Sequence, residues 1–348
     1  MNSNDDDSVI HRIWSNTKLF AAATSLSNSK LQVRELSRDN KSQWTDGTAV
    51  VNNTTYDKFM KLPEFWWHCE EVTANTDRWK IDFTMDNPND GSWNHWDGNT
   101  FIGVYEAYNA SNKVYSRTGR TPTGSVTWTN FKAYAAARGA GYSLVTYEAH
   151  QIMALLGYGW LGTTDDQSIV GYGGNECNKV TGKCDAKGIH DTNAAVDGGN
   201  TAGGGSNISI NFWGLENWWG NMYEWVDNIQ TANSSGLINI LTPGSSTVNR
   251  TVQTTANSGG CITKTTMGDK GDMIPKAYVS DDTYSKGYAS DGYVSTGAGR
   301  VARRSNTYSY AYGGLGSLGV YDAAGISSAA VGSRLLYHGD WEENNTLT

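Results

Sequence analysis

The chain has 348 residues, including 40 glycines, 14 tryptophans and 19 tyrosines, with a charged fraction of 18% and a formal net charge of −8. The glycines follow no three-residue period and no apolar heptad is sustained, which excludes a collagen and a coiled coil. The acidic balance disfavours nucleic-acid binding, which needs a basic surface, and no apolar run is long enough to predict a membrane-spanning helix.

The N-terminal region, residues 1–60, alternates short apolar patches with polar runs and is predicted to form short strands and turns. From Lys61 onward, aromatic and β-branched runs are separated by turn sequences such as DNPNDGS, which predicts strands of a sheet with one buried face. The start of the chain shows no basic and apolar leader pattern, so we expect no cleaved signal peptide.

Two helices are predicted after these strands. Thr129 or Asn130 can cap a first helix through FKAYAAARG, which Gly139 would end. Thr146 can cap a second helix, YEAHQIMALLG, with Glu148 in its first turn, where the helix dipole favours an acidic residue. The buried stripe of this second helix is predicted to comprise Ala149, Ile152, Met153 and Leu156.

Residues 171–211 are rich in Gly, Asn and Asp and predict a long surface loop, functional or excursive. Cys177 and Cys184 flank a polar hexapeptide in this loop, and the sequence leaves open whether they form a small disulfide or remain free thiols. The four cysteines form no paired CxxC units, so a zinc ribbon is not expected.

The common catalytic and metal-binding spacings do not occur in the chain. The six histidines form no HxH or HExxH pattern, and neither GxSxG nor a phosphate-binding loop is present. Asp165–Asp166 and Asp281–Asp282 stay open as contributors to a calcium site. Glu224 and Asp227 are expected to bond within the core rather than to act as an acid–base pair. We therefore predict no catalytic residue, no metal site and no cofactor.

The segment Gly214–Asp227, GLENWWGNMYEWVD, resembles the G-L-x(4)-G-N-x-x-E-W signature of the formylglycine-generating-enzyme type of C-type lectin fold. The run Gly141–Ala149 is similar to that family's step from a strand into its second helix, and Gly332–Leu335 to its last strand. The resemblance covers roughly residues 125–348. It implies an α+β fold, with two helices packed on short antiparallel sheets, many loops and an added N-terminal β-rich region.

The residues of this segment give a physical reason for a core position. Gly214 and Gly220 allow tight turns where backbone approaches backbone. Glu224, surrounded by apolar residues, must be satisfied internally by backbone amides or by an arginine. The aromatic residues of the segment are expected to supply a large buried area, namely Trp213, Trp218, Trp219, Tyr223 and Trp225.

Several functions occur on this fold, so the residues of the site must decide among them. Oxidases of the family use a late pair of copper-binding cysteines, but only Cys261 lies late in this chain. The iron-binding histidine cluster of the sulfoxide synthases and the calcium-binding EPN, QPD and WND tripeptides of the lectins are absent as well. The resemblance therefore implies a non-enzymatic display scaffold. A calcium-dependent carbohydrate lectin and, less favoured, an oxidase remain the alternatives.

Residues 306–330, NTYSYAYGGLGSLGVYDAAGISSAA, contain no Lys, Glu, Gln, Met or Trp. These residue types cannot be reached when the two adenines of an AAC or AAT codon are randomised. This absence is the footprint expected of a diversity-generating retroelement. The variable proteins that the chain resembles carry their varied stretch just before the final strand of a C-type lectin domain. Tyr, Ser, Gly and Asn also dominate antibody paratopes, because they combine rigid contact area with adaptable hydrogen bonding.

The candidate ligand-facing residues in this segment are Asn306, Thr307, Tyr308, Tyr310, Tyr312, Ser317, Leu318, Tyr321, Asp322, Ser327 and Ser328. Residues 61–348 would form the ligand-binding domain, and residues 1–60 an attachment or trimer-forming region. The whole chain looks like variable proteins of gut Bacteroidales and their phages. That likeness implies a protein or glycan receptor on a cell surface as partner, a location on a virion tail or an extracellular surface, and no membrane insertion; it leaves a homotrimer open.

Overall fold

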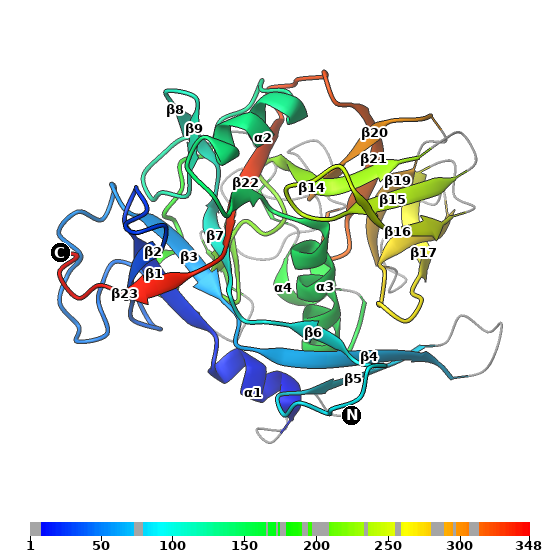
Figure 1. Cartoon of the computed structure of the whole chain (residues 1–348), viewed down its shortest axis with the longest axis horizontal. Coiled ribbons are helices and arrows are strands. Elements are labelled where there is room, and N and C mark those ends of the chain that lie inside the picture. Colours follow the sequence, from blue (N-terminus) through cyan, green and yellow to red (C-terminus); the bar gives the residue numbers. More distant parts are fainter. Residues whose placement is uncertain are drawn as a thin grey trace.

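The computed structural model describes residues 8–348 except 73–78, 165, 172, 175–178, 190–193, 197–208, 233–235, 255–258, 280–288, 295–296 and 306–312. One large sheet organises the described residues (Figure 1). Its strands, in spatial order, are β18 (Ile274–Val279), β17 (Gly259–Thr266), β19 (Ala289–Val294), β21 (Leu318–Ala323), β20 (Arg300–Arg304), β14 (Tyr223–Thr231), β22 (Val331–His338), β7 (Thr100–Glu106), β3 (Asp57–Lys61), β1 (Lys18–Ala22), β2 (Leu31–Glu35) and β23 (Trp341–Glu343). β10 (Tyr142–Leu144) also pairs with β22, while β15 (Leu237–Leu241) and β16 (Val248–Gln253) extend from β14.

The two central strands, β14 and β22, run parallel and are almost continuously buried. Burial on both faces explains why their sequences lack the clean alternation of polar and apolar residues that a half-exposed strand shows. Smaller sheets flank this centre. They comprise β4 (Phe65–Glu71), β5 (Trp79–Thr84) and β6 (Asn94–Trp96); β8 (Tyr108–Ala110) and β9 (Lys113–Tyr115); and β11 (Ala194–Val196), β12 (Ser209–Phe212) and β13 (Leu215–Glu216).

The helix α3 (Tyr147–Leu161) lies near the centre of the molecule, above β4 and β6 in the view of Figure 1. The predicted cap is confirmed, because the Thr146 hydroxyl accepts a hydrogen bond from the Ala149 amide at 3.3 Å. All four residues of the predicted stripe are fully buried. The helix continues past Gly157, where an added Cβ would lie 2.5 Å from Leu315, so that glycine serves close packing and does not end the helix.

The helix α2 (Trp128–Ala136) begins earlier than Thr129 or Asn130, so the predicted cap is wrong. Thr127 caps it instead, with its hydroxyl accepting from the Asn130 amide at 3.2 Å. Trp128 belongs to the first turn, and its indole Nε1 donates to the Val226 carbonyl of β14 at 2.9 Å. This contact to the sheet cannot be inferred from the local sequence pattern.

Residues 1–60 contribute to the main sheet through β1 and β2. They also contain a helix that was not predicted, α1 (Val9–Ser15), which Ser8 caps. β1 pairs antiparallel with β3, and β2 pairs parallel with β23 near the C-terminus. The predicted boundary at residue 60 falls inside β3, so the described residues on both sides share one sheet. The attachment or trimer-forming role of residues 1–60 stays a prediction.

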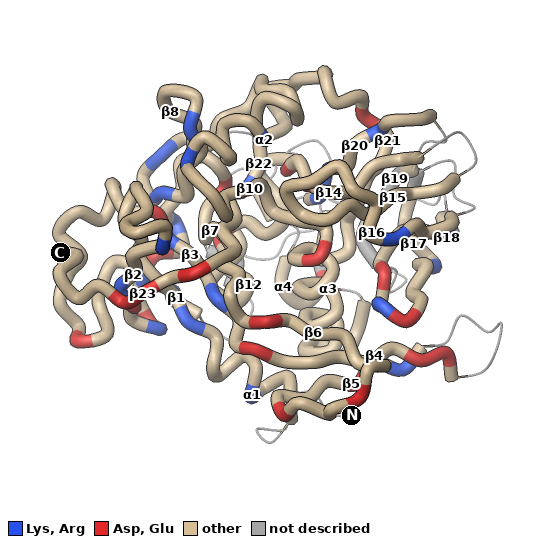
Figure 2. Tube along the Cα trace, in the orientation of Figure 1, with Lys and Arg blue, Asp and Glu red and all other residues tan. Residues whose placement is uncertain are grey.

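The coarse α+β expectation agrees with the described residues, which are mostly strands with a few helices, including the short α4 (Asp166–Val170) and the 3-10 turn Asp185–Lys187. Acidic and basic residues are interspersed along the described trace (Figure 2). Among the residues that the structure describes, no helix is long and apolar enough to cross a bilayer.

Candidate functional site

A buried carboxylate on β14 ties three strands of the main sheet together. The Arg334 guanidinium of β22 donates to Glu224 at 2.7 and 3.0 Å, and Arg304 of β20 donates to the second carboxylate oxygen. All three side chains are fully buried. The register explains the convergence, since Glu224 lies opposite Arg304 on one side and opposite Gly332 on the other, two residues from Arg334.

The surrounding groups satisfy most of the remaining hydrogen-bonding capacity of the two arginines. Arg334 also donates to the carbonyls of Gly103, Val104, Glu216 and Asn217 at 2.7 to 2.9 Å. The Arg304 guanidinium lies 3.4 Å from the ring centroid of Trp218. Burial and the nearby Glu224 charge raise the pKa of Glu106 to about 8. The expectation that an arginine satisfies Glu224 is confirmed.

The aromatic residues of the same segment form the core around this network. Trp213, Trp218, Trp219 and Trp225 are buried, as predicted, whereas Tyr223 is only half-buried. Gly220 adopts a φ of +86°, and a Cβ there would lie 2.7 Å from Gly173, which explains the requirement for glycine. Asp227 is buried and pairs with Lys132 at 2.7 Å, so it belongs to the framework, as expected.

The network fixes both ends of the candidate ligand-facing segment. Arg304 lies two residues before the segment begins, and Arg334 lies four residues after it ends. Asn306, Thr307, Tyr308, Tyr310 and Tyr312 lie outside the described residues, so their placement is not tested. The two strands that flank the segment are described, and both bind the same carboxylate.

The described half of the segment is partly interior. Leu318 is 0% exposed and packs with Val226 and Val320, and Ser317 is 5% exposed and donates to the Ser305 carbonyl at 2.9 Å. These two residues therefore do not face a ligand, contrary to the prediction. The reason is that β21 begins at Leu318 and its alternate side chains point into the sheet interior.

The remaining predicted residues lie closer to the surface. Ser327 and Ser328 are exposed, beside Ile326, whose side chain is 46% exposed. Tyr321 is half-buried, and Asp322, at 8% exposure, lies 3.4 Å from the Arg303 guanidinium. Burial raises the pKa of Asp322 from its usual range. Asp322 is thus paired with Arg303, and its ligand-facing role stays a prediction.

Arg303 was not singled out from the sequence, although it organises the described surface here. Its guanidinium lies 3.9 Å from the ring centroid of Tyr223 and 4.5 Å from that of Tyr321. Arg303 and Arg304 are neighbours on β20, so their side chains leave opposite faces of the sheet. This alternation is the sequence signal that could have placed Arg303 on the surface. We call Tyr223, Arg303 and Tyr321 the arginine–tyrosine patch.

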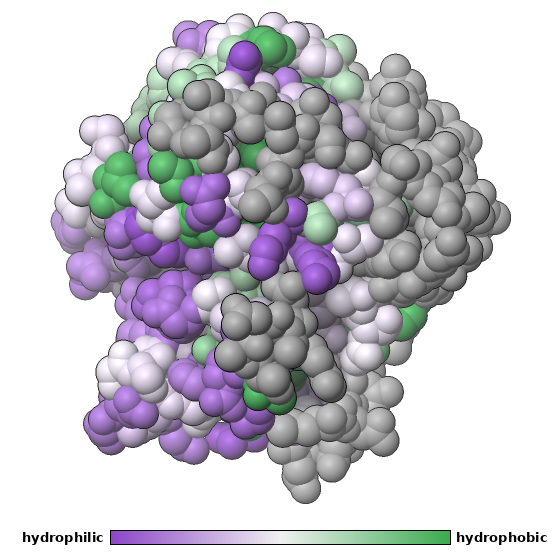
Figure 3. All heavy atoms as spheres, turned by 90° about the vertical axis from the view of Figure 1, so that its right-hand side faces the viewer, coloured by the Kyte–Doolittle hydropathy of each residue, from purple (hydrophilic) through white to green (hydrophobic). Residues whose placement is uncertain are grey.

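The described surface on the side of β15, β17 and β19 mixes hydrophilic residues with separate small hydrophobic patches (Figure 3).

Among the described residues, no cluster of three or more His, Cys, Asp or Glu side chains could hold a metal ion. Asp166 accepts from the Leu315 amide at 2.5 Å, and the other three aspartates of the open calcium question lie outside the described residues. Cys184 is buried with a free thiol, and Cys177 lies outside the described residues, so the pairing of these two cysteines stays an open prediction.

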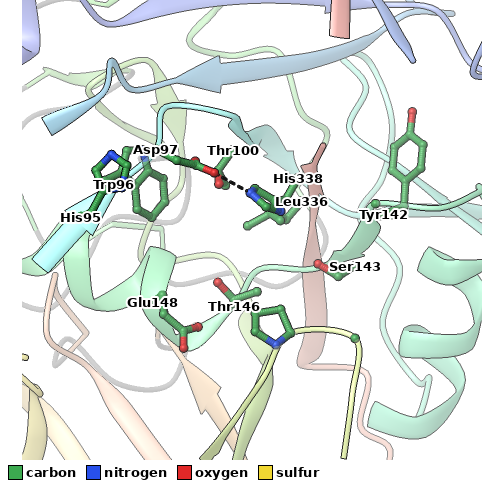
Figure 4. Close-up of a pocket in the computed structure, with 13 residues that line it drawn as sticks. His95, Trp96, Asp97, Thr100, Tyr142, Ser143, Thr146, Glu148, Leu336 and His338 are labelled. Atoms are coloured by element: carbon green, nitrogen blue, oxygen red, sulfur yellow. Dashed lines mark hydrogen bonds and ion pairs between the residues drawn. The ribbon is translucent and has the colours of Figure 1, made fainter. Parts of the chain in front are cut away.

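A cavity of about 480 Å³ lies near the end of β22 that is farther from this segment. Its lining, drawn in Figure 4, mixes apolar and polar residues. Its polar lining includes Asp97, Thr100, Ser143, Thr146, Glu148 and His338. Sequence reasoning missed it because the lining comes from four separate stretches of chain that form no motif. The sequence had singled out Thr146 and Glu148 only as residues at the start of a helix.

The charged groups of this cavity are paired. His338 Nε2 lies 2.9 Å from Asp97, which raises the pKa of the imidazole and lowers that of the carboxyl. Glu148 accepts from Asn228 at 2.7 Å, and burial raises the pKa of its carboxyl. The cavity can therefore offer hydrogen bonds without an unbalanced charge.

A buried histidine beneath the network predicts acid sensitivity. Burial and the positive charge of Arg304 lower the pKa of His150 well below its usual value, and neither ring nitrogen has a hydrogen-bond partner among the described residues. Below pH ~6.5 the unfolded chain binds a proton that the folded chain does not, so stability falls by about 1.4 kcal/mol per pH unit until the folded pKa is reached.

We expect His150→Leu to remove this dependence. Urea denaturation at neutral pH and about one pH unit below the ordinary histidine pKa of ~6.5 would measure it. The half-exposed His68 offers the control His68→Gln, which should keep the slope of the parent protein. An unchanged slope in His150→Leu would show that this imidazole titrates normally in the folded state.

No family model and no curated protein matches the chain. Among solved structures, PvdO from Pseudomonas aeruginosa is similar at 14% sequence identity, over 82% of this chain and 95% of that one, with a TM-score of 0.35. The Major Tropism Determinant U1 variant matches at 13% identity, over 92% and 72%, with a TM-score of 0.32. The M1 variant matches at 13%, over 93% and 73%, with a TM-score of 0.33. With TM-scores this low, function must be argued from the chain's own residues.

Proposed function

We propose that this chain is a non-enzymatic binding protein whose C-terminal surface, within residues 306–330, recognises a macromolecule on a cell surface. The observation that carries the proposal is the attachment of both flanking strands to Glu224. A segment held at both ends by a buried network loses less conformational entropy when it binds, which favours affinity. Its Tyr, Ser and Gly composition suits contact with a large partner.

The finer features of the proposal rest on sequence. The absence of Lys, Glu, Gln, Met and Trp from residues 306–330 supports diversification by a retroelement that mutates template adenines. The resemblance to C-type lectin variable proteins supports a phage tail receptor binder or a cell-surface adhesin of the Bacteroidales class. A protein or glycan receptor and a homotrimer belong to the same proposal.

The alternatives have less support from the residues. An oxidase of the formylglycine-generating type would need a late cysteine pair, whereas Cys261 is the one late cysteine of the chain and is buried on β17. A calcium-dependent lectin would need oxygen ligands, of which Asp166 already bonds the Leu315 amide. Copper-dependent oxidation of a cysteine peptide would favour the first alternative, and sugar binding that a chelator abolishes would favour the second.

Sequencing this gene across many descendants of one culture tests the proposal most directly. We expect substitutions confined to the codons of residues 306–330 and to positions of template adenines, with a near-copy repeat and a reverse transcriptase gene nearby. Identical codons in every descendant would contradict a diversified receptor binder.

Tyr321 of the arginine–tyrosine patch provides a test at the protein level. We expect Tyr321→Ala to cost under ~1 kcal/mol of unfolding free energy, as half-exposed substitutions usually do, while changing the binding of labelled protein to a panel of intact gut Bacteroidales isolates. Urea denaturation and flow cytometry measure the two effects. A large loss of stability would show that this ring is part of the core, and unchanged binding to every isolate that the parent protein labels would remove Tyr321 from the site.

A further inference from the structure

The cavity at the far end of β22 is distant from the proposed ligand-binding surface. Val331 begins β22 beside the segment, whereas Leu336 and His338 line the cavity near the end of the strand. Seven residues of extended strand separate the two ends by about 23 Å. The cavity volume of about 480 Å³ falls within the range of small-molecule sites.

The hydroxyl groups of the cavity present both donors and acceptors. Thr146 uses its oxygen to accept from the Ala149 amide, which leaves its O–H free to donate. Ser143 donates to the Leu144 carbonyl at 3.0 Å, which leaves its lone pairs free to accept. The Thr100 side chain has no hydrogen bond among the described residues. These three groups come from different elements and line one space (Figure 4).

The carboxylates of the cavity are held in place and partly compensated. Asp97 accepts from the Asn99 amide at 2.9 Å and faces His338 at 2.9 Å. Glu148 accepts from Asn228, and Arg250 lies 3.9 Å from its other oxygen. Each carboxylate oxygen retains a lone pair for a further hydrogen bond. A strongly charged ligand would meet no unpaired counter-charge here.

We propose that this cavity binds a neutral sugar, independently of calcium and of the C-terminal surface. A sugar hydroxyl can donate and accept hydrogen bonds at the same time. It therefore matches a lining that offers hydroxyl donors together with hydroxyl and carboxylate acceptors. Pro243 and Leu336 supply apolar wall for the C–H groups of the ring. His95, also in the lining, lies 2.8 Å from Glu64 and stacks on Trp66 with ring centroids 4.7 Å apart.

Saturation-transfer difference NMR with the methyl glycosides of glucose, galactose, mannose and N-acetylglucosamine tests this inference on the full chain. We expect at least one glycoside to receive saturation, with and without a chelator. Ser143→Leu places a larger apolar side chain in the cavity and should weaken binding about tenfold or more, as should Asp97→Asn, which preserves shape but removes the charge. Thr251→Leu, an exposed strand hydroxyl outside the cavity, should leave sugar binding unchanged.

Several outcomes would overturn the inference. Absence of saturation for all four glycosides would do so, as would full binding in both cavity variants or loss of binding with the chelator. Loss in Ser328→Leu with Ser143→Leu unaffected would place the sugar on the C-terminal surface, which would support the proposed function and refute this site. Failure of the proposed function would leave the cavity result unchanged.

Discussion

Glu224→Gln should destabilise the protein by about 3–5 kcal/mol, because it leaves two buried arginines without their counter-charge. The substitution preserves the shape of the side chain, so the loss measures charge and not packing. Arg304 and Arg334 are both fully buried and cannot recover solvation without opening the sheet. Urea denaturation monitored by tryptophan fluorescence would give the change in unfolding free energy.

Glu70→Gln is the matched control for this measurement. Glu70 lies on β4, is exposed and faces Lys80 at 3.7 Å, so its pairing is screened by water. We expect Glu70→Gln to change the free energy of unfolding only slightly. If Glu224→Gln were as mild as Glu70→Gln, the buried network would not hold the strands that flank residues 306–330, and the proposed function would lose its structural basis.

Trp225→Ala should cost about 3–5 kcal/mol, as expected when a buried aromatic ring is truncated and leaves a cavity. Trp225 is fully buried beside Phe131 and Leu335, and its indole Nε1 donates to the Val126 carbonyl at 3.1 Å. Trp225→Phe, which retains a ring but loses the hydrogen bond, should cost clearly less. Both are measured by urea denaturation.

Comparing the free energies of unfolding lost in Trp225→Ala and in Trp225→Phe separates the effect of buried area from that of the hydrogen bond. A near-neutral Trp225→Ala would mean that this segment does not form the core of the domain. A loss in Trp225→Phe equal to that in Trp225→Ala would assign the cost to the hydrogen bond with Val126 and not to buried area.

Much of the framework was predictable because it depends on local pattern. The Thr146 cap, the buried stripe of α3 and the strands after Lys61 follow from capping chemistry and periodicity, which act over a few residues. The burial of Trp218 and Trp225 follows from the density of large aromatic residues around them. The start of α2 was mispredicted because Thr127 and Thr129 are equally good caps by local pattern, and only the contact of Trp128 with β14 distinguishes them.

The sequence by itself determined that Glu224 needs an internal partner, that residues 306–330 have a paratope-like composition, and where α3 begins. Only the tertiary structure decided which arginines bind Glu224, since they lie 80 and 110 residues away and are brought there by strand order. It also decided that Leu318 is buried while Ser328 is exposed, and that Asp97, Ser143 and His338 line one cavity. The physical reason is that caps and periodicity act between chain neighbours, whereas pairing and cavities depend on which strands become adjacent.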